Sequence, residues 1–418
     1  MESLIALDRR TPAMRWRDVR DESSLWGELR PELAAAVSQI LHSTMEDELA
    51  TLLAARPYER TVRRRDHRNG RFRRWLATEI GAIELSVPRA RDTVYHPSFL
   101  ERAARRTSTV DGLLRQAFLR GLSTRETAAL AEKLTGVSLS AAAVSRLTAV
   151  LDGQVAAFHG RPIELPVRYL LLDGLWVSVR NHSRHAQRRV VLAAYGISAD
   201  GRRELLDYRQ ATAESAVAWG VLLRSLIGRG LDPDGVVLVV ADGADGIAAA
   251  VAEALPEASL QRCWTHRVRN LLDAIPVGER KGALRGLRAI YRAPTKRAAV
   301  AAYWRFAVAW RKRHPRLVAS LERDLETLLP VFGLPAPIRV SLRTTNLIER
   351  AFRELRRRLR SIGALSDRPS ADRILYGQVT RLNELLARRP LAAFTQESDF
   401  VGIGPLHRPG RRGEPQMR

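Results

Sequence analysis

The chain has 418 residues, 45% of them apolar, and a formal net charge of +24 from 69 Lys+Arg against 45 Asp+Glu. This length and composition predict a globular protein of two or three domains and exclude a largely disordered chain. The positive charge indicates a polyanionic partner, with a nucleic acid as the first candidate; a membrane surface or a genome biased towards arginine codons is the alternative explanation.

The N-terminal sequence MESLIALDRR has early acidic residues and no long apolar run, so we expect no secretory signal. No stretch of the chain approaches the length of a membrane span. The single cysteine excludes an intrachain disulfide and the multi-cysteine zinc sites. We therefore expect a cytoplasmic protein.

A helix and a basic run are predicted near the N-terminus. Residues 31–55 carry apolar residues at helical spacing. Residues 58–75 contain eight arginines, two acids and interleaved aromatic residues. Such a run is either a solvated charged face or a loop that follows a phosphate backbone. Residues 76–92 alternate apolar and polar and predict short strands with a turn at Gly81. The phosphate-binding candidates of the basic run are Arg63, Arg64, Arg65, Arg71 and Arg73.

Residues 123–150 predict two helices joined by a short turn. Ser123 and Glu126 have the spacing of a capping box, Gly136 interrupts the pattern, and Ser140 begins a second helix. This outline is typical of a helix-turn-helix, whose second helix enters the DNA major groove, and equally of a plain pair of packed helices. The candidates for DNA contacts on the second helix are Ser145 and Arg146.

An α/β pattern begins after the prolines of residues 161–168. Three strand-like runs are followed by a helix, a strand, a helix and a short strand that ends near Arg262, which predicts an α/β layer. The pattern then becomes helical from about residue 267 to 345. A last, strongly basic helix is predicted at 347–360.

Two aspartates lie on strand-like runs of this layer, and each is followed by glycine. Asp173 lies within YLLLDGLWV, and Asp242 ends the run VVLVVA. Each alone is more simply a structural residue at a turn. Together they are more informative, because ligands gather at the carboxyl ends of strands in such sheets.

Glu349 is a candidate third carboxylate. It follows Asn346 by three residues, so it has an alternative explanation as part of a helix capping box. Three carboxylates can bind two divalent cations for phosphodiester chemistry, and their oxygen ligands suit Mg²⁺ or Mn²⁺. At this point the capping role and the metal role of Glu349 both remain open, and Asp173, Asp242 and Glu349 could together hold two such ions.

Cys263 and His266 have the i, i+3 spacing that places two side chains on one face of a helix. They supply half of a zinc site at most. A buried cysteine beside a hydrogen-bonded histidine, or a Cys–His nucleophile pair, are the other interpretations. We find no phosphate-binding P-loop or dinucleotide glycine motif in a suitable context.

Residues 242–270 resemble the signature of the mutator-type transposases of bacterial insertion sequences. The pattern is D-x3-G, a helix, a proline, and then Q-x-C-x2-H followed by Arg-Asn. Shorter similarities surround Asp173 and Glu349 and extend through the N-terminal half. The residues that match the long pattern are Asp242, Gly246, Ile247, Pro256, Gln261, Cys263, His266, Arg269 and Asn270.

The resemblance implies a multidomain α and α/β protein. It implies an N-terminal DNA-binding region and a ribonuclease-H-like catalytic domain with a DDE triad at Asp173, Asp242 and Glu349, interrupted by an all-helical insertion. Cys263 and His266 would support this site structurally. The expected segments are a DNA-binding region at 1–160, a catalytic domain at 165–266 and 346–400, the insertion at 267–345, and a disordered basic tail at 401–418.

The implied activity is cleavage and transfer of DNA strands at the ends of an insertion sequence. The expected partners are the terminal inverted repeats, target DNA and further copies of the chain, as a homodimer or larger assembly. A DNA-binding protein that has lost this chemistry, and a nuclease that never joins strands, are the alternatives. The candidates for DNA contact beside the third acid are Arg353, Arg356 and Arg357.

Overall fold

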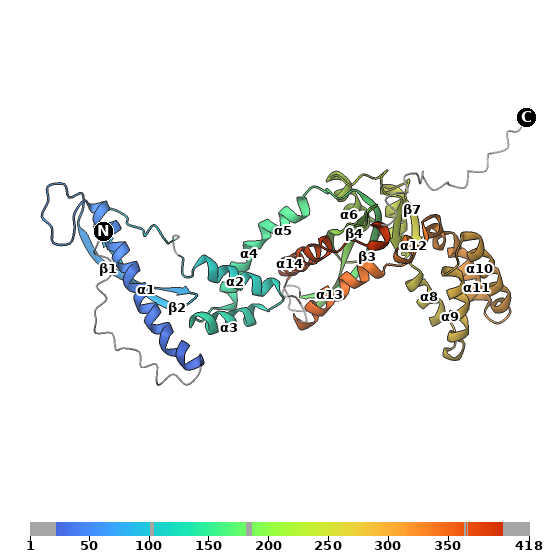
Figure 1. The fold of residues 1–418 in the computed structure, drawn as a ribbon, viewed down its shortest axis with the longest axis horizontal. Coiled ribbons are helices and arrows are strands. Elements are labelled where there is room, and N and C mark those ends of the chain that lie inside the picture. Colours follow the sequence, from blue (N-terminus) through green and yellow to red (C-terminus); the bar gives the residue numbers. More distant parts are fainter. Residues whose placement is uncertain (1–21, 101–103, 181–185, 363–364, 366, 396–418) are drawn as a thin grey trace, which may run out of the picture. The chain divides into compact units, whose positions relative to one another are not determined.

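The computed structural model describes residues 22–100, 104–180, 186–362, 365 and 367–395 (Figure 1). Its contacts divide the chain into two compact units. The first comprises Met1–Phe118 and Leu122–Ala149, and the second comprises Leu119–Gly121 and Val150–Arg418. We expected the first boundary after residue 160. The division lies before helix α5 (Leu151–Gly160), because α5 packs against helix α14 of the second unit and its His159 contacts Asp207 of strand β5. The expected tail at 401–418 lies outside the described residues.

The first unit begins with a long helix against a hairpin. Helix α1 (Glu22–Leu53) packs on strand β2 (Gly81–Ala90), which pairs antiparallel with β1 (Arg68–Thr78). Met45 of α1 meets apolar residues of both strands in one core. The hairpin turns at Gly81, whose φ of 122° favours glycine. The predicted turn is confirmed, and the first strand begins earlier than expected, inside the basic run.

Three short helices complete this unit. They are α2 (Ser108–Leu119), α3 (Thr124–Thr135) and α4 (Ala141–Ala149). Both halves of the Ser123–Glu126 capping box form, and Gly136 ends α3 in the left-handed conformation. The Ser140 hydroxyl accepts a hydrogen bond from Ala143 N–H (3.1 Å). The two predicted helices and the turn between them are confirmed.

The second unit is built on a five-stranded mixed sheet in the order β5-β4-β3-β6-β7. The first three strands are antiparallel, and β6 and β7 are added parallel to β3. Their long apolar runs are typical of strands covered on both faces. The strand bounds are β3 Val167–Arg180, β4 Ala186–Ser198, β5 Arg203–Ala211, β6 Leu238–Ala241 and β7 Ser259–Arg262.

Helices cover the two faces of this sheet. Helices α6 (Ala216–Gly228) and α7 (Asp245–Ala254) pack on one face, where Leu172 and Ala241 belong to a single apolar core. Helices α13 (Asn346–Ile362) and α14 (Arg368–Ala387) contact strands β3 and β5 on the other side (Figure 1).

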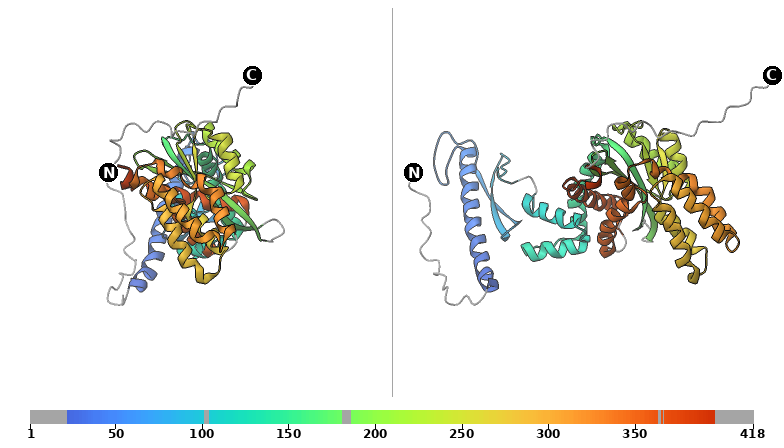
Figure 2. Two further views of the ribbon diagram at one scale, coloured as in Figure 1. Left: turned by 90° about the vertical axis from the view of Figure 1, so that its right-hand side faces the viewer. Right: turned by 45° about the vertical axis from the view of Figure 1, so that its right-hand side comes forward.

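A helical segment separates β7 from α13. In Figure 1 and in the right-hand view of Figure 2 it stands beside the sheet. The buried side chains of Gln261 and Trp264 both donate hydrogen bonds to the carbonyl of Leu328, at 3.1 and 2.9 Å, and so fix the end of α11 to the sheet edge. Its helices are α8 Trp264–Asp273, α9 Val277–Tyr291, α10 Lys296–Arg311, α11 Pro315–Leu328 and α12 Ala336–Leu342.

The prediction that the helix near 347–360 is the last one was wrong. Helix α14 and a short α15 (Ala392–Thr395) follow it. Helix α14 escapes recognition because some residues on its buried face are polar. Arg373 is buried there and forms a bidentate ion pair with Asp152 of α5 (2.6 and 2.7 Å).

Across the described ranges, no helix combines the length and apolar composition that a bilayer-spanning segment requires.

Asp207 is the buried charge that joins α5, β5 and the end of α6, and its removal is expected to destabilise the second unit. Its carboxylate contacts His159 Nδ1 (2.7 Å) and Arg229 Nη2 (2.6 Å). Asp207→Ala leaves the Arg229 side chain, which is only 11% exposed, without its counter-charge, so we expect a loss of about 3–5 kcal/mol in unfolding free energy. Urea denaturation measures this loss. Asp273→Ala, which breaks a more exposed pair with Arg280, should cost less than about 1 kcal/mol; equal losses would contradict the prediction.

Candidate active site

Pairing of β3 with β6 brings two aspartates together, Asp173 from the middle of β3 and Asp242 from the position directly after β6. The strands are parallel, with Leu171 opposite Val240. Continuing this register by two residues places Asp173 level with Asp242. The two carboxylates therefore come from adjacent strands, at the level where β6 ends and β3 continues.

Strand alternation places both carboxylates on the same face. Leu172 and Ala241 point into the core beneath α6 and α7. The next residues, Asp173 and Asp242, therefore point to the opposite face, which α13 covers. This is the face on which Glu349 approaches.

Glu349 lies in the first turn of α13 but not at a capping-box position. The helix begins at Asn346, and Glu349 N–H donates to the Thr345 carbonyl (2.9 Å), which makes Thr345 the N-cap. The Thr345 hydroxyl donates to Glu349 Oε1 (2.8 Å), and His266 Nε2 lies 3.8 Å from the same oxygen. The alternative that Glu349 serves a cap at Asn346 is therefore contradicted.

The carboxylates are close enough to affect one another. Asp173 is only 7% exposed. Its pKa is raised to about 7, mainly by burial, against the opposing effects of the His266 charge and a hydrogen bond from Gly174 N–H. The negative charges of Glu349 and Asp242 contribute to this rise. The structure thus brings the three predicted acids into one electrostatic neighbourhood.

Cys263 connects the second acid to the third. Its N–H donates to the carbonyl of Ala241 (2.7 Å), directly before Asp242. Its buried Sγ accepts a hydrogen bond from Thr345 N–H (3.3 Å). One fully buried residue therefore ties the end of β6 to the N-cap of the helix that carries Glu349.

His266 balances charge at this junction. The Cys263 side chain, followed by the charges of Asp173 and Glu349, raises the His266 pKa to about 9 against the effect of burial. Burial also raises the pKa of the Cys263 thiol, but hydrogen bonds with His266 and Thr345 outweigh it and lower that pKa. His266 is therefore an imidazolium at neutral pH, next to two of the acids.

A catalytic or metal role for Cys263 fits this geometry poorly. Its thiol is inaccessible to substrate, which disfavours the nucleophile pair. The ligand atoms of Cys263, His266 and Glu349 lie within 4.8 Å of one another. The thiol and the carboxylate, however, already accept hydrogen bonds from Thr345. The arrangement favours a supporting role.

The aspartate oxygens fit a hard divalent cation. Asp173 Oδ1 accepts from Gly174 N–H (2.9 Å), and Asp242 Oδ1 accepts from Ala244 N–H (3.0 Å). Within the part of the chain that the structure describes, the second oxygen of each accepts no hydrogen bond and neither residue forms an ion pair. Oxygen donors with uncompensated charge are the ligands that Mg²⁺ and Mn²⁺ prefer.

Glu214 is an acid of this neighbourhood that the sequence analysis missed. It precedes Ser215, the N-cap of α6, and its carboxylate lies against Gly174. Burial and then the charge of Asp242 raise its pKa. In the sequence Glu214 looks like an ordinary acid at a helix start. The feature that could have indicated its position is Gly174, the glycine after Asp173, which leaves space for a neighbouring side chain.

The candidate DNA-contacting arginines of the basic run differ in exposure and in whether they already form an ion pair. Arg63 and Arg65 are exposed, and Arg64 is half-buried. Arg71 and Arg73 are exposed but pair with Glu46 (2.7 Å) and Glu84 (3.5 Å) of the same unit. Part of the positive charge of the hairpin is therefore already compensated.

The candidate DNA-contacting residues on helices α4 and α13 are exposed. Ser145 and Arg146 project from α4, whose Val144 and Leu147 are buried. On α13, Arg353, Arg356 and Arg357 are exposed. Of these, Arg357 pairs with Glu354 (2.8 Å). The positions permit contact with a polyanion.

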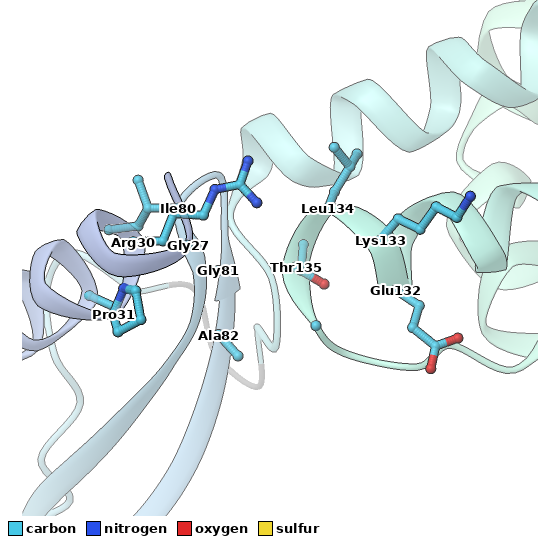
Figure 3. Close-up of a pocket in the computed structure, with 12 residues that line it drawn as sticks. Gly27, Arg30, Pro31, Ile80, Gly81, Ala82, Glu132, Lys133, Leu134 and Thr135 are labelled. Carbon is cyan, nitrogen blue, oxygen red and sulfur yellow. The ribbon is translucent and has the colours of Figure 1, made fainter. Parts of the chain in front are cut away.

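A hollow in the first unit does not involve the acids. It is lined by the start of α1, the hairpin turn and the end of α3 (Figure 3). Its charged lining residues, Arg30, Glu132 and Lys133, have mixed signs. It offers no cluster of catalytic groups.

Comparison with known proteins places this geometry in context. The model of the family described as "Transposase, Mutator family" matches residues 20–385. The chain is 36% identical over 326 residues to the transposase for insertion sequence element ISRM5 of Rhizobium meliloti, covering 78% of this chain and 81% of that protein. It is 36% identical over 353 residues to the transposase for IS406 of Burkholderia multivorans (84% and 90%). It is 30% identical over 351 residues to the transposase for IS256 in transposon Tn4001 of Staphylococcus aureus (83% and 89%).

Asp173→Asn is expected to stabilise the metal-free protein at high pH. Its pKa is raised from 3.8 to about 7 on folding. The unfolded chain therefore releases this proton at a lower pH than the folded chain does, and the free energy of unfolding falls as pH rises between those two values. The amide keeps the acceptor for Gly174 N–H. With EDTA present, the midpoint of thermal unfolding should rise by roughly 2–4 °C for each kcal/mol gained. The gain should be larger at pH 8 than at pH 5, and a difference independent of pH would contradict this.

Cys263→Ala is expected to lower the pKa of His266 from about 9 towards its ordinary value of 6.5, because the Cys263 side chain is the largest cause of the rise. An NMR titration of the histidine ring protons measures this change. Cys263→Ser, which retains a hydrogen-bonding group, should keep part of the shift. An unchanged pKa in Cys263→Ala would mean that the acids alone hold the proton.

Proposed function

Because the chain belongs to the Mutator family of transposases, we propose that it is the transposase of an insertion sequence, which binds terminal inverted repeats and cleaves and transfers DNA strands with divalent metal ions. The observation that carries the proposal is the convergence of Asp173, Asp242 and Glu349 on one face of the sheet. Their carboxylates form the proposed DDE triad.

The proposed catalytic domain is ribonuclease-H-like. A mixed sheet with three antiparallel strands followed by two parallel ones supports it. Helices α8 to α12, between the second and third acids, form the proposed insertion. Glu349 returns to the sheet only after this segment, at the start of α13.

In the proposed mechanism, Asp173, Asp242 and Glu349 would hold two Mg²⁺ or Mn²⁺ ions. The bound ions would activate the attacking water or 3′-hydroxyl and stabilise the leaving oxygen. His266 offsets part of the negative charge and lies beside Glu349 Oε1. Cys263 and Thr345 hold the helix start in place, so that the three carboxylates keep their relative positions.

The reaction has two steps. Water cleaves the phosphodiester bond at the element end and leaves a 3′-hydroxyl. This hydroxyl then attacks a target phosphodiester, so that one ester bond forms as another breaks. Holding two ends for this reaction requires more than one copy of the chain, which supports a homodimer or larger assembly.

The proposed DNA contacts follow exposure and charge. Ser145 and Arg146 on α4 would contact bases, and the arginines of residues 63–73 would contact phosphates. Arg353 and Arg356 on α13 would contact the backbone near the cut. Phosphate contacts of this kind weaken as salt rises.

Strand cleavage and joining are expected to depend on metal and on Glu349. The purified protein is incubated with a labelled duplex that carries one element end, a target plasmid, and either Mg²⁺ or EDTA. Nicked and joined products should form with Mg²⁺ only. Glu349→Gln should retard the duplex as the wild type does but yield no product.

Three outcomes would contradict the proposal in whole or in part. Retarded DNA without nicking under any divalent metal would leave a DNA-binding protein only. Nicking without joined product would indicate a nuclease. Undiminished activity of Glu349→Gln would remove Glu349 from the triad.

A further inference from the structure

We propose that a cavity lined by Arg292, Arg343 and Arg350 binds a backbone phosphate of the DNA, other than the scissile one. The inference rests on the proposed function and deepens it, because it adds a DNA-binding site where the helical segment joins the sheet. It is carried by three arginines that share one cavity, none of whose described lining residues is acidic. We call this site the arginine cavity.

The arginine cavity lies where helices α8, α9, α12 and α13 meet. Its volume of about 410 Å³ is within the range of roughly 300–1,000 Å³ that ligand-binding clefts have. Arg292 directly follows α9, Arg343 directly follows α12, and Arg350 lies near the start of α13. Three elements that are separate in the sequence therefore contribute one positive charge each.

The three guanidinium groups have no acidic partner among the residues that the structure describes. Arg292 and Arg350 are exposed and form no ion pair there. Arg343 is half-buried, donates to the carbonyl of Tyr291 (3.4 Å) and lies over the ring of the same residue (5.3 Å to its centroid). Its charge is thus held in place by an aromatic residue and a carbonyl, without being neutralised.

A bound anion would compensate this charge. Burial lowers the pKa of Arg343; Tyr291 opposes this effect, and the charge of Arg292 adds to it. Like charges held close together in a partly buried site are unfavourable unless an opposite charge is present. The buried Arg267 of α8 has such a charge in Asp324 (2.6 Å). For the arginine cavity a phosphate would supply it, because phosphate oxygens match the geometry of guanidinium groups.

The arginine cavity and the acids lie on different sides of the same two helix starts. Asn346 and Arg350 are one turn apart on α13 and line the cavity, whereas Glu349 lies beside His266. On α8, Thr265 lines the cavity and the next residue, His266, approaches Glu349. A phosphate in the cavity is therefore a neighbour of the scissile phosphate. The N-terminus of α13, at Asn346, adds partial positive charge.

A purely structural role would look different. Arginines that only hold a fold together bond to groups of the chain, as Arg339 does with the carbonyls of Pro294 (2.8 Å) and Leu334 (3.0 Å). Within the described ranges, the side chains of Arg292 and Arg350 donate no hydrogen bond to the chain. Their guanidinium groups are available to a ligand.

The test replaces single phosphates of a labelled element-end duplex by neutral methylphosphonates. The affinity of the full-length protein for each duplex is measured with EDTA present. Where the replaced phosphate is the one bound in the arginine cavity, we expect the wild type to lose about 10-fold in affinity. The double variant Arg292→Gln/Arg350→Gln should bind the unmodified duplex about 10-fold more weakly and show little further loss at that position.

The matched control is Arg305→Gln, which removes an exposed arginine of α10 that does not line the cavity. It should respond to every methylphosphonate as the wild type does. Each single variant changes one exposed side chain and replaces the double variant if that fails to fold; its further loss should be smaller than the loss of the wild type.

A salt titration gives a second measurement. The slope of log affinity against log salt concentration should be shallower in the double variant by about 0.9, the value for one phosphate contact. A change of structure away from the DNA would alter affinity without removing the effect of one particular phosphate.

The outcomes separate the two proposals. A double variant that responds to every methylphosphonate as the wild type does would overturn the role of the arginine cavity, even if the wild type cleaves and joins DNA. Insensitivity of the double variant at one position, in a protein that never cleaves, would support the cavity and overturn the proposed function. No binding of the duplex by the wild type would overturn both.

Discussion

Cys263 forms the contact on which the geometry of the candidate site depends. Its backbone is hydrogen-bonded to Ala241, at the end of the strand before Asp242, and its thiol to Thr345, the N-cap of the helix that carries Glu349. Between these acids the chain leaves the sheet, forms the helices α8 to α12 and returns. A small, buried, polarisable side chain suits such a junction because it packs like an apolar residue and still accepts a hydrogen bond.

The helical segment is held to the same junction from its own side. Gln261 and Trp264 both donate to the carbonyl of Leu328, and Arg267 pairs with Asp324 (2.6 Å). Residues on both sides of Cys263 are thus anchored to α11, and Trp264 N–H donates to the carbonyl of Arg343 after α12 (3.1 Å). The start and end of the segment are fixed together, so the position of Glu349 relative to the sheet does not depend on a long free loop.

Charge is distributed unevenly within the second unit. The buried Asp207 has a basic partner in Arg229. Where β6 ends beside β3, the carboxylates of Asp173 and Asp242 form no ion pair among the described residues, and His266 is a cation whose charge affects Asp173. An arrangement that is unfavourable for the metal-free fold is typical of a site that becomes stable when its ligand binds.

The sequence alone determined the local features of this protein. The capping box of Ser123, the turn at Gly81, the strand runs and the two aspartates followed by glycine depend on neighbouring residues, and the family pattern from Asp242 to Asn270 is equally local. Only the tertiary structure decided that Thr345 caps α13, that Cys263 joins the second and third acids, that Arg373 is buried against Asp152, and that Glu214 reaches Gly174. These contacts join residues tens to hundreds of positions apart, and periodicity and capping signals carry no information over such separations because they arise within a few residues of one another.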